Sequence, residues 1–317
     1  MLRARVVGFN SSDESRYNCY SLIKSLKQRN IHSDFLAINE AEVRSQFFPQ
    51  GTEVNNSDFI FNFVKKIEKV DITIFSDPVF FTPSDLVLSQ KLERLKKTSA
   101  VFVNEVGNHR DISNKVFMYR KLIEADIPIP KTFFILCDAE DSIINETVNM
   151  LGGYPVVLKS PIGTMGNGVF KCNTLQRVKD ILEYFKNFYY IKNENPVIIQ
   201  EYIDTQGLFI CTRVIKDKIF SRFSLGSPYA ENTFKSNISS NRACVACKVT
   251  SELSDLCFKT MNAAGLDTAR IDIFINKGKL SVCEVNSIGS IVINEFACNV
   301  DISDLIVQTA IDKFESL

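Results

Sequence analysis

Two acidic residues on neighbouring predicted strands form the strongest chemical pattern in the sequence. They lie in ARIDIFINKGKLSVCEVNS, residues 269–287, where alternating apolar residues flank Asn276-Lys277-Gly278. This pattern predicts a β-hairpin with a three-residue loop, in which Ile275 pairs with Lys279. The pairing determines which side chains share a face of the sheet. It places Arg270, Asp272, Glu284 and Asn286 on one face, and Ile271, Ile273, Cys283 and Val285 on the other.

Two carboxylates on one face of a sheet favour a cation between them. Asp272 and Glu284 at ~4 Å would repel each other by roughly 4 kcal/mol at an effective dielectric of about 20. Mg²⁺ takes carboxylate oxygens, keeps several waters and commonly joins a protein to the phosphates of a substrate. Asn286 can add a neutral oxygen ligand. The alternative is a structural ion pair in which Arg270 neutralises Glu284, and the hairpin alone leaves both interpretations open.

A glycine-rich loop lies between two other predicted strands, in YPVVLKSPIGTMGNGVFKC, residues 154–172. Strands are expected over 154–159 and 169–172, with the loop 160–168 between them. The spacing is similar to a dinucleotide-binding fingerprint, but that motif requires a helix directly after the glycines. A strand, loop and strand can instead cover a triphosphate with amide groups, or form a flexible hairpin with no ligand. Close backbone approach is expected at Gly163, Gly166 and Gly168.

Composition limits the class of protein. The chain has 317 residues, of which 45% are hydrophobic and 23% charged, so two or three domains are expected. Lys and Arg number 37 and Asp and Glu number 37, so no excess of cations is present to bind nucleic acid. No apolar run approaches the ~20 residues that span a bilayer, and the N-terminus does not resemble a signal peptide. These observations predict a soluble cytoplasmic protein.

Cysteine and histidine usage gives little support to metal, redox or imidazole chemistry. The nine cysteines are scattered and lie mostly in apolar segments, which is typical of buried, reduced thiols. Cys244 and Cys247 form a C-x-x-C motif, but no second pair accompanies it. The two histidines, His32 and His109, lie near no other recognisable motif, so acid–base chemistry by histidine is not expected.

The order of predicted elements indicates an α/β protein with three parts. The first part, 1–104, alternates strands and helices as a parallel α/β domain does. The second, 105–193, contains the glycine-rich loop, and the third, 194–317, contains the two carboxylates. The expected strands of the first part are 5–9, 33–38, 70–75 and 100–103, and its expected helices are 14–29 and 84–97. Further helices are expected at about 114–125, 175–185 and 302–314.

Taken in order, the motifs resemble the ATP-grasp superfamily and, within it, the ribosomal-protein glutamate ligase-like (RimK-like) branch of carboxylate–amine ligases. The resemblance covers roughly residues 104–310. It rests on NKVFMYRKLIEADIPIPKT, PVVLKSPIGTMGNGVF, IIQEYI, TFKSN, RIDIF and CEVNS. It implies an ATP-grasp fold, in which an N-terminal parallel α/β domain precedes two lobes that clasp ATP.

The resemblance also assigns roles to individual residues. The phosphate-binding lysines of the family fall on Lys115 and Lys159, and the glycine loop would cover the phosphates of ATP. Adenine would be recognised at the hinge, formed by Gln200, Glu201, Tyr202 and Ile203. Lys235 stands at a basic position of the family motif and Asn237 at its asparagine, both expected to assist catalysis. The implied ligands of Mg²⁺, or of Mn²⁺, are Asp272, Glu284 and Asn286.

Several residues depart from the family pattern. Arg270 stands where D-alanine:D-alanine ligases carry an arginine that stabilises the tetrahedral intermediate, whereas the glutamate ligases usually have glycine. The family shows Asp-Ile-Arg where this chain has Phe209-Ile210-Cys211, so a ribose partner and a basic residue are missing. Arg213 lies on the same strand face as Cys211 and is expected to replace that charge at the cofactor. Two loops on the acceptor side also differ, Ser239-Ser240-Asn241-Arg242 and Ser287-Ile288-Gly289-Ser290.

The activity that the resemblance implies is amide formation. ATP would phosphorylate a small-molecule or peptide carboxylate, and the amine of an amino acid would attack the acyl phosphate and release phosphate. Neither a nucleic acid nor a membrane is an expected partner, and a homo-oligomer is left open. One alternative is a small-molecule kinase of the same fold. The other is a nucleotide-binding interaction protein without turnover, which the residues at 209 and 211 favour.

Overall fold

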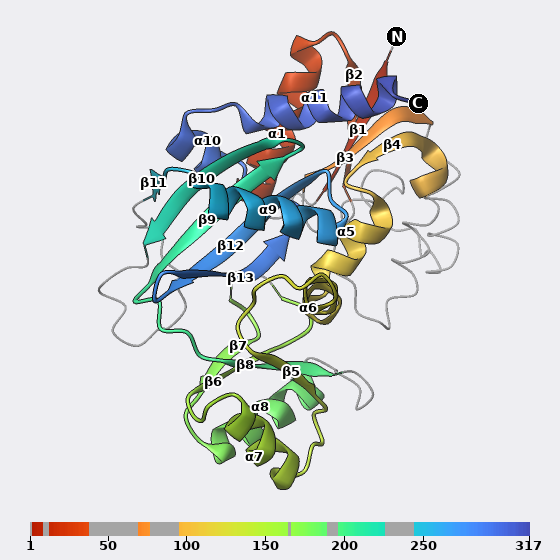
Figure 1. The fold of residues 1–317 in the computed structure, drawn as a ribbon. Helices are drawn as coiled ribbons and strands as arrows, with labels where there is room; N and C mark the ends of the chain where they lie inside the picture. Colours follow the sequence, from red (N-terminus) through yellow and green to blue (C-terminus); the bar gives the residue numbers. More distant parts are fainter. Residues whose placement is uncertain are drawn as a thin grey trace, which may run out of the picture.

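The computed structural model describes residues 2–8, 13–37, 69–76, 95–163, 166–188, 196–225 and 244–317. These residues form three sheets, which Figure 1 shows one above another. A sheet near the two termini lies at the top, a five-stranded sheet in the middle, and a smaller lobe at the bottom. None of the helices in the described ranges has both the length and the hydrophobicity of a membrane span.

The first sheet is parallel throughout, in the order β2-β1-β3-β4. This confirms the predicted parallel α/β unit. The strands are β1 (Arg3–Gly8), β2 (His32–Ala37), β3 (Val70–Phe75) and β4 (Ser99–Val103), accompanied by α1 (Asp13–Gln28) and the short η1 (Lys96–Thr98). Most of the predicted helix at 84–97 falls outside the described residues.

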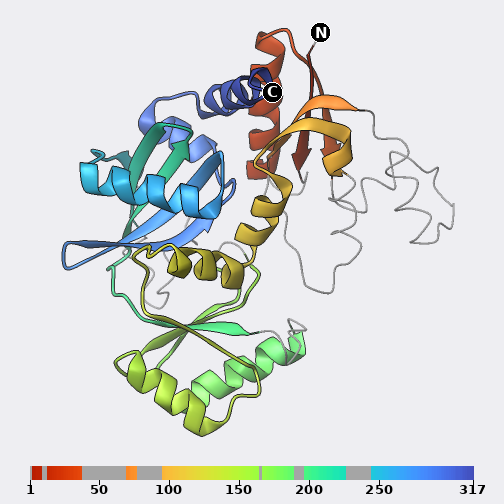
Figure 2. The same ribbon diagram turned by 45° about the vertical axis from the view of Figure 1, so that its right-hand side comes forward.

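The last helix of the chain, α11 (Ile302–Glu315), packs against this first sheet. Its apolar side chains join those of α1, β1 and β3 in one core. Arg29 of α1 forms an ion pair with Asp304 of α11 at 2.8 Å. Figure 2 shows the two helices together beside both termini. The helix at the end of the predicted third part therefore contributes to the core of the first.

The small lobe is an antiparallel sheet in the order β5-β8-β6-β7, with two helices over it. The glycine-rich loop joins β6 to β7, which confirms the predicted strand–loop–strand unit. The elements are β5 (Thr132–Ile135), α7 (Asp141–Met150), β6 (Val156–Lys159), β7 (Val169–Cys172), α8 (Leu175–Phe188) and β8 (Val197–Glu201).

The five-stranded sheet is antiparallel, in the order β11-β10-β9-β12-β13. Helices α6 and α9 contribute to the core on its apolar face, and α6 lies between this sheet and the small lobe in Figure 2. The strands are β9 (Leu208–Ile215), β10 (Lys218–Leu225), β11 (Cys244–Ala246), β12 (Thr268–Asn276) and β13 (Lys279–Asn286). The helices are α5 (Val106–Ser113), α6 (Lys115–Glu124), α9 (Ser251–Ala264) and α10 (Val292–Cys298).

The loop of the β12–β13 hairpin is shorter than predicted. Asn276 pairs with Lys279, so the loop is Lys277-Gly278, with φ of 49° and 78° at its two residues. A two-residue turn with positive φ at both positions matches the twist of the flanking strands, which explains why it replaces the three-residue loop. The predicted pairing of Ile275 with Lys279 was therefore wrong.

A β-bulge returns Glu284 to the predicted face, although Cys283, which was predicted on the apolar face, becomes the unpaired residue of the bulge. The register shifts between Asp272 and Ile273, because Ile273 pairs with Val282 whereas Asp272 pairs with Glu284. Cys283 is the extra residue. Without it the shorter loop would place Glu284 on the apolar face, since a shift of one residue inverts a strand. Both carboxylates consequently lie on the same face, as predicted, although the loop length is different.

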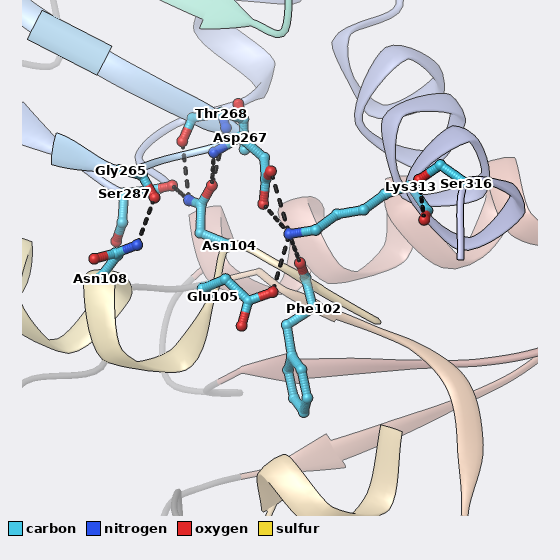
Figure 3. A network of polar contacts seen from close by, with 10 residues as sticks. All are labelled: Phe102, Asn104, Glu105, Asn108, Gly265, Asp267, Thr268, Ser287, Lys313 and Ser316. Atoms are coloured by element: carbon cyan, nitrogen blue, oxygen red, sulfur yellow. Dashed lines mark hydrogen bonds and ion pairs between the residues drawn. The ribbon is translucent and has the colours of Figure 1, made fainter. Parts of the chain in front are cut away.

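A buried asparagine joins the first sheet to the hairpin (Figure 3). Asn104, directly after β4, is fully buried. Its side-chain oxygen accepts hydrogen bonds from the amides of Asp267 and Thr268, and its Nδ2 donates to the carbonyls of Thr268 and Ser287 at 2.9 and 2.7 Å. Lys313 of α11 reinforces the junction through Asp267 at 3.0 Å. The start of β12 and the end of β13 are thereby held by one side chain.

Replacing Asn104 by Ala should destabilise the protein strongly, because four backbone groups would lose their partner inside the protein. We expect a loss of roughly 3 kcal/mol in the free energy of unfolding. Asn108→Ala is the matched control, since Asn108 makes an exposed bond to the Gly265 carbonyl, and should cost less than about 1 kcal/mol. Urea unfolding followed by circular dichroism measures both, and equal losses would contradict the role of Asn104.

Candidate active site

The two carboxylates face each other across the hairpin. Asp272 of β12 is paired with Glu284 of β13 on one side and with Cys211 of β9 on the other. Residues in register on adjacent antiparallel strands have their Cβ atoms roughly 4.5–5.5 Å apart. A single small cation can therefore contact both side chains. The structure confirms the shared face that the sequence predicted for the two acids.

Arg270 neutralises Asp272. Its Nε and one Nη donate to the two carboxylate oxygens at 3.1 and 2.7 Å, a two-point contact that only a guanidinium makes. Burial would lower the pKa of Arg270, but the adjacent Asp272 carboxylate holds it well above its ordinary value. The predicted alternative paired Arg270 with Glu284, whereas the residue in direct contact with Arg270 is Asp272.

Lys115 neutralises Glu284. Lys115 is the first residue of α6, where Asn114 caps the helix by accepting from the amides of Val116 and Phe117. Its Nζ lies 3.2 Å from the Glu284 carboxylate. Burial would raise the pKa of Glu284, but Lys115, and to a smaller extent Lys159 and Arg270, hold it below its ordinary value. The second carboxylate is therefore ionised at neutral pH.

The same lysine reaches the glycine-rich loop. Lys115 Nζ donates to the Gly163 carbonyl at 2.6 Å, and its backbone amide donates to Pro161 at 2.7 Å. Gly163 has φ of 147°, and a Cβ there would lie 2.5 Å from the Asn167 carbonyl oxygen. Only glycine fits this turn. Gly166 and Gly168 also have positive φ, at 76° and 73°. Lys115 thus contacts both the predicted phosphate-binding loop and the strand that carries the predicted metal ligand Glu284.

The second lysine is fixed through a tyrosine that sequence reasoning missed. Lys159, at the end of β6, donates to the Tyr119 hydroxyl at 2.8 Å, and this hydroxyl donates to the Cys283 carbonyl at 2.6 Å. Burial raises the pKa of Tyr119, so the phenol is neutral. Tyr119 lies four residues after Lys115 on α6, and this spacing, which places both on one helix face, was the available signal.

The predicted hinge residues lie at the end of β8 and directly after it, since β8 ends at Glu201. Gln200 is buried and its Nε2 donates to Thr132 Oγ1 at 2.7 Å. One oxygen of Glu201 accepts from the Lys131 amide at 2.7 Å, which leaves the other for a ligand. Tyr202 carries the Lys171 ammonium over its ring at 3.7 Å, and Ile203 is half-buried. The segment connects the small lobe to the five-stranded sheet.

Three further residues were predicted to lie in the site, namely Arg213, Lys235 and Asn237. Lys235 and Asn237 lie outside the described residues, so their catalytic assignments remain predictions. Arg213 is fully buried and donates to the carbonyls of Gly289 and Ser290 at 3.0 and 3.3 Å. These partners belong to the loop after Asn286, on the far side of Asp272 from Lys115.

The donor set suits Mg²⁺ or Mn²⁺ better than a soft metal. Two carboxylates and the Asn286 amide provide hard oxygen ligands, and the remaining positions suit water or phosphate oxygens. Within the described ranges, no group of three or more His, Cys, Asp or Glu residues could hold a metal. Lys115 and Arg270 balance the carboxylates where the ion would lie. The site therefore fits a metal shared with a ligand.

Comparison with known proteins gives a family and several relatives. The model of the RimK-like ATP-grasp domain matches residues 112–310. N-acetylaspartylglutamate synthase A of Homo sapiens is 27% identical over 244 residues, which cover 75% of this chain and 60% of that protein. A probable alpha-L-glutamate ligase of Pseudomonas paraeruginosa is 29% identical over 166 residues, covering 52% of this chain and 53% of that protein. The chain thus spans at most 60% of the length of these two relatives.

Solved structures confirm the fold class. The structure of D-alanine–D-alanine ligase from Bacillus anthracis matches with a TM-score of 0.67 at 15% sequence identity, and covers 100% of this chain and 98% of that chain. At this identity the likeness concerns the fold alone. Together with the family match, it confirms the predicted ATP-grasp architecture.

Lys159→Met should weaken ATP binding at least tenfold, because the ammonium lies at the end of β6 beside the glycine loop and no buried carboxylate depends on it alone. The fold should persist, with a midpoint of thermal unfolding close to that of the wild type. Lys179→Met removes a surface lysine that pairs with Asp141 and serves as the control. Calorimetric titration with an ATP analogue measures the affinity, and wild-type affinity in Lys159→Met would remove this lysine from the site.

Glu284→Gln should reduce the dependence of stability on pH. Because the folded pKa of Glu284 is lowered, its carboxylate contributes stability above its unfolded pKa of about 4.5, and this contribution is lost as the pH falls through the lower folded value. The stability advantage of wild type over Glu284→Gln should therefore shrink between pH 6 and pH 3. Glu183→Gln, on the exposed side of α8, should follow the wild type. A constant difference across this range would show that Glu284 is not stabilised by its lysines.

Proposed function

We propose, from the premise that this chain belongs to the RimK-like ATP-grasp domain family, that it is an ATP-dependent carboxylate–amine ligase. The observation that carries the proposal is that Lys115, the first residue of α6, contacts both the glycine loop and the Glu284 carboxylate. Two lysines, two carboxylates and a loop of close backbone approach are the parts that positioning and neutralising a triphosphate requires.

The reaction needs no nucleophilic side chain. A substrate carboxylate attacks the γ-phosphorus of ATP, the bond to the bridging oxygen breaks, and ADP leaves. The amine then attacks the acyl phosphate, an amide forms, and phosphate leaves with loss of a proton from nitrogen. When bound, Mg²⁺ would neutralise phosphate charge as a Lewis acid, held by Asp272, Glu284 and Asn286.

The residues of the chain supply position and charge. Lys115 and Lys159 offset the negative charge of the transferring group, and the glycine loop excludes water from it. Lys115 must exchange its contact with Glu284 for contact with phosphate when the ligand enters. Arg270, beside Asp272, is placed to donate two hydrogen bonds to an oxyanion that develops at the substrate carboxyl.

We propose glutamate as the amine. Both relatives carry glutamate in their names, as N-acetylaspartylglutamate synthase and alpha-L-glutamate ligase. The identity of the acid is open to a direct screen, in which ADP release is measured over a set of carboxylic acids crossed with amino acids. Release that requires both an acid and an amine supports the ligase. Release with acid alone indicates a kinase, and ATP binding without release indicates a protein that has lost turnover.

Arg270→Ala should bind ATP nearly as the wild type does and lose about 10²–10³ in kcat for amide formation, because a donor to the oxyanion acts in the transition state. Arg270→Lys should recover little, since an ammonium lacks the planar fork. Steady-state kinetics on the acid and amine from the screen measure both. A lysine variant within a few-fold of wild type would show that Arg270 only balances charge.

A further inference from the structure

Three arginines gather on the polar face of the five-stranded sheet. Arg213 of β9 lies directly opposite Arg270 of β12, and Arg222 of β10 lies opposite Cys211. We call Arg213, Arg222 and Arg270 the arginine cluster. Arg270 shares β12 with Asp272, and the strand order places Arg213 and Arg222 on the side of Asp272 away from β13, whereas Lys115 contacts Glu284 on β13 itself. Arg213 and Arg222 therefore lie on the opposite side of Asp272 from the strand that Lys115 contacts.

Positive charge in the cluster exceeds negative charge. Arg270 has a carboxylate partner in Asp272. Arg213 donates only to two backbone carbonyls, and Arg222 donates to Asn294 Oδ1 and Cys244 Sγ, each at 3.2 Å. No carboxylate of the described residues forms an ion pair with Arg213 or Arg222. Like charges directly opposite each other destabilise a sheet, so the pairing of Arg213 with Arg270 is unfavourable without an anion.

Buried donors in this region lack partners. Arg213 Nε and Nη1, Asn294 Nδ2 and Ser290 Oγ have no hydrogen-bond partner among the described residues. Each of these residues is at most 1% exposed. They are neighbours, because Ser290 accepts from Arg213, and Asn294 accepts from Arg222 and contacts Cys211, two residues before Arg213. Buried donors are normally satisfied, and orphaned ones that occur together indicate a missing acceptor.

The charge state of Arg213 strengthens this conclusion. Burial, together with the like charges of Arg270 and Arg222, lowers the pKa of Arg213 to about 10. The guanidinium is nevertheless protonated at neutral pH. A buried cation without a counter-charge is costly, and an anion that enters beside it removes the cost.

We propose that the arginine cluster, with Asn294 and Ser290, is a subsite for a second carboxylate of the acid substrate, which is therefore a diacid or higher polyacid. The inference rests on the proposed ligase function and names the class of its acid. It also changes the expected role of Arg213, from binding the cofactor to binding the acid substrate.

Geometry favours the acid over the nucleotide as the source of this carboxylate. The phosphates belong beside Lys115 and Lys159, and the reacting carboxylate beside Arg270. Arg213 and Arg270 are directly paired on adjacent strands, which puts these two positions roughly 4.5–5.5 Å apart. The two ends of a diacid of about four to six carbons can therefore contact both sites. Arg270, with 18% of its side chain exposed, forms the accessible edge along which the ligand would enter.

A carboxylate also suits the donors chemically. A guanidinium presents two parallel N–H groups to the two oxygens of a carboxylate, and Nε and Nη1 of Arg213 are the nitrogens without partners. The Asn294 amide and the Ser290 hydroxyl can donate to remaining lone pairs. A neutral amide in place of the carboxylate would lose the charge and present an N–H group to a set of donors.

Calorimetric titration of the full chain tests the proposal without turnover. Succinate, glutarate and adipate are titrated in the presence of Mg²⁺ and a non-hydrolysable ATP analogue, each beside its monoamide. Because these acids have no amino group, their affinity reports on the binding site of the acid substrate and not on that of the amine. We expect at least one diacid to bind wild type tenfold or more tightly than its monoamide. Acetate and inorganic phosphate at equal concentration should bind more weakly than that diacid.

Arg213→Gln should reduce the preference for the diacid to less than threefold while leaving the affinity for the nucleotide analogue within threefold of wild type. Arg213→Lys keeps the charge without the fork and should also lose most of the preference, which provides a second variant if the first folds poorly. Arg110→Gln, which removes one exposed charge paired with Asp111, is the control and should behave as the wild type.

Three results would overturn the proposal. They are a wild type that binds every diacid no better than its monoamide, an Arg213→Gln variant that keeps the preference, and binding of acetate or phosphate as tight as that of the best diacid. The ligase assignment is judged separately, by ADP release. A protein that prefers diacids but releases no ADP in any combination would contradict the ligase function and leave the subsite supported.

Discussion

The register of β13 against β12 is the constraint on which the candidate site depends. A two-residue turn alone would direct Glu284 to the apolar face, and the bulge at Cys283 returns it to the face of Asp272. The bulge also frees the Cys283 carbonyl to accept from Tyr119, which in turn fixes Lys159. One extra residue therefore positions both a proposed metal ligand, Glu284, and a proposed phosphate-binding lysine, Lys159. Bulges near active sites commonly redirect side chains in this way.

The protein separates two charged regions on one face of a sheet. Near β13 and the glycine loop, the charges of Lys115 and Lys159 balance the Glu284 carboxylate. In the proposed function, phosphate and a metal ion replace these contacts. Toward β10, arginines exceed the carboxylates near them, and buried donors lack acceptors. Asp272 lies between, in contact with Arg270. In the proposed function, the nucleotide and the acid would bind on opposite sides of the reacting centre, which is the geometry that transfer of phosphate from one to the other requires.

The sequence predicted the local patterns well and the long-range contacts poorly. Alternation and glycine spacing identified the hairpin, the glycine loop and the parallel α/β unit, because these depend on neighbouring residues. The bulge was missed, since Cys283 looks like any apolar strand residue. The burial of Arg213 against Gly289 and Ser290 was not predicted, because it depends on the path of a loop that is distant in the sequence. Asn104 carries no signal that distinguishes it from a loop asparagine.

We infer that Arg270 and Lys115 neutralise Asp272 and Glu284 until a metal ion and a triphosphate replace those contacts. The affinity of the wild-type protein for a non-hydrolysable ATP analogue, measured by calorimetry over a series of Mg²⁺ concentrations, tests this claim most directly. The affinity for the analogue should rise at least tenfold from zero to saturating Mg²⁺, and Mn²⁺ should substitute for Mg²⁺. An affinity for the analogue that does not change with either metal would contradict the account.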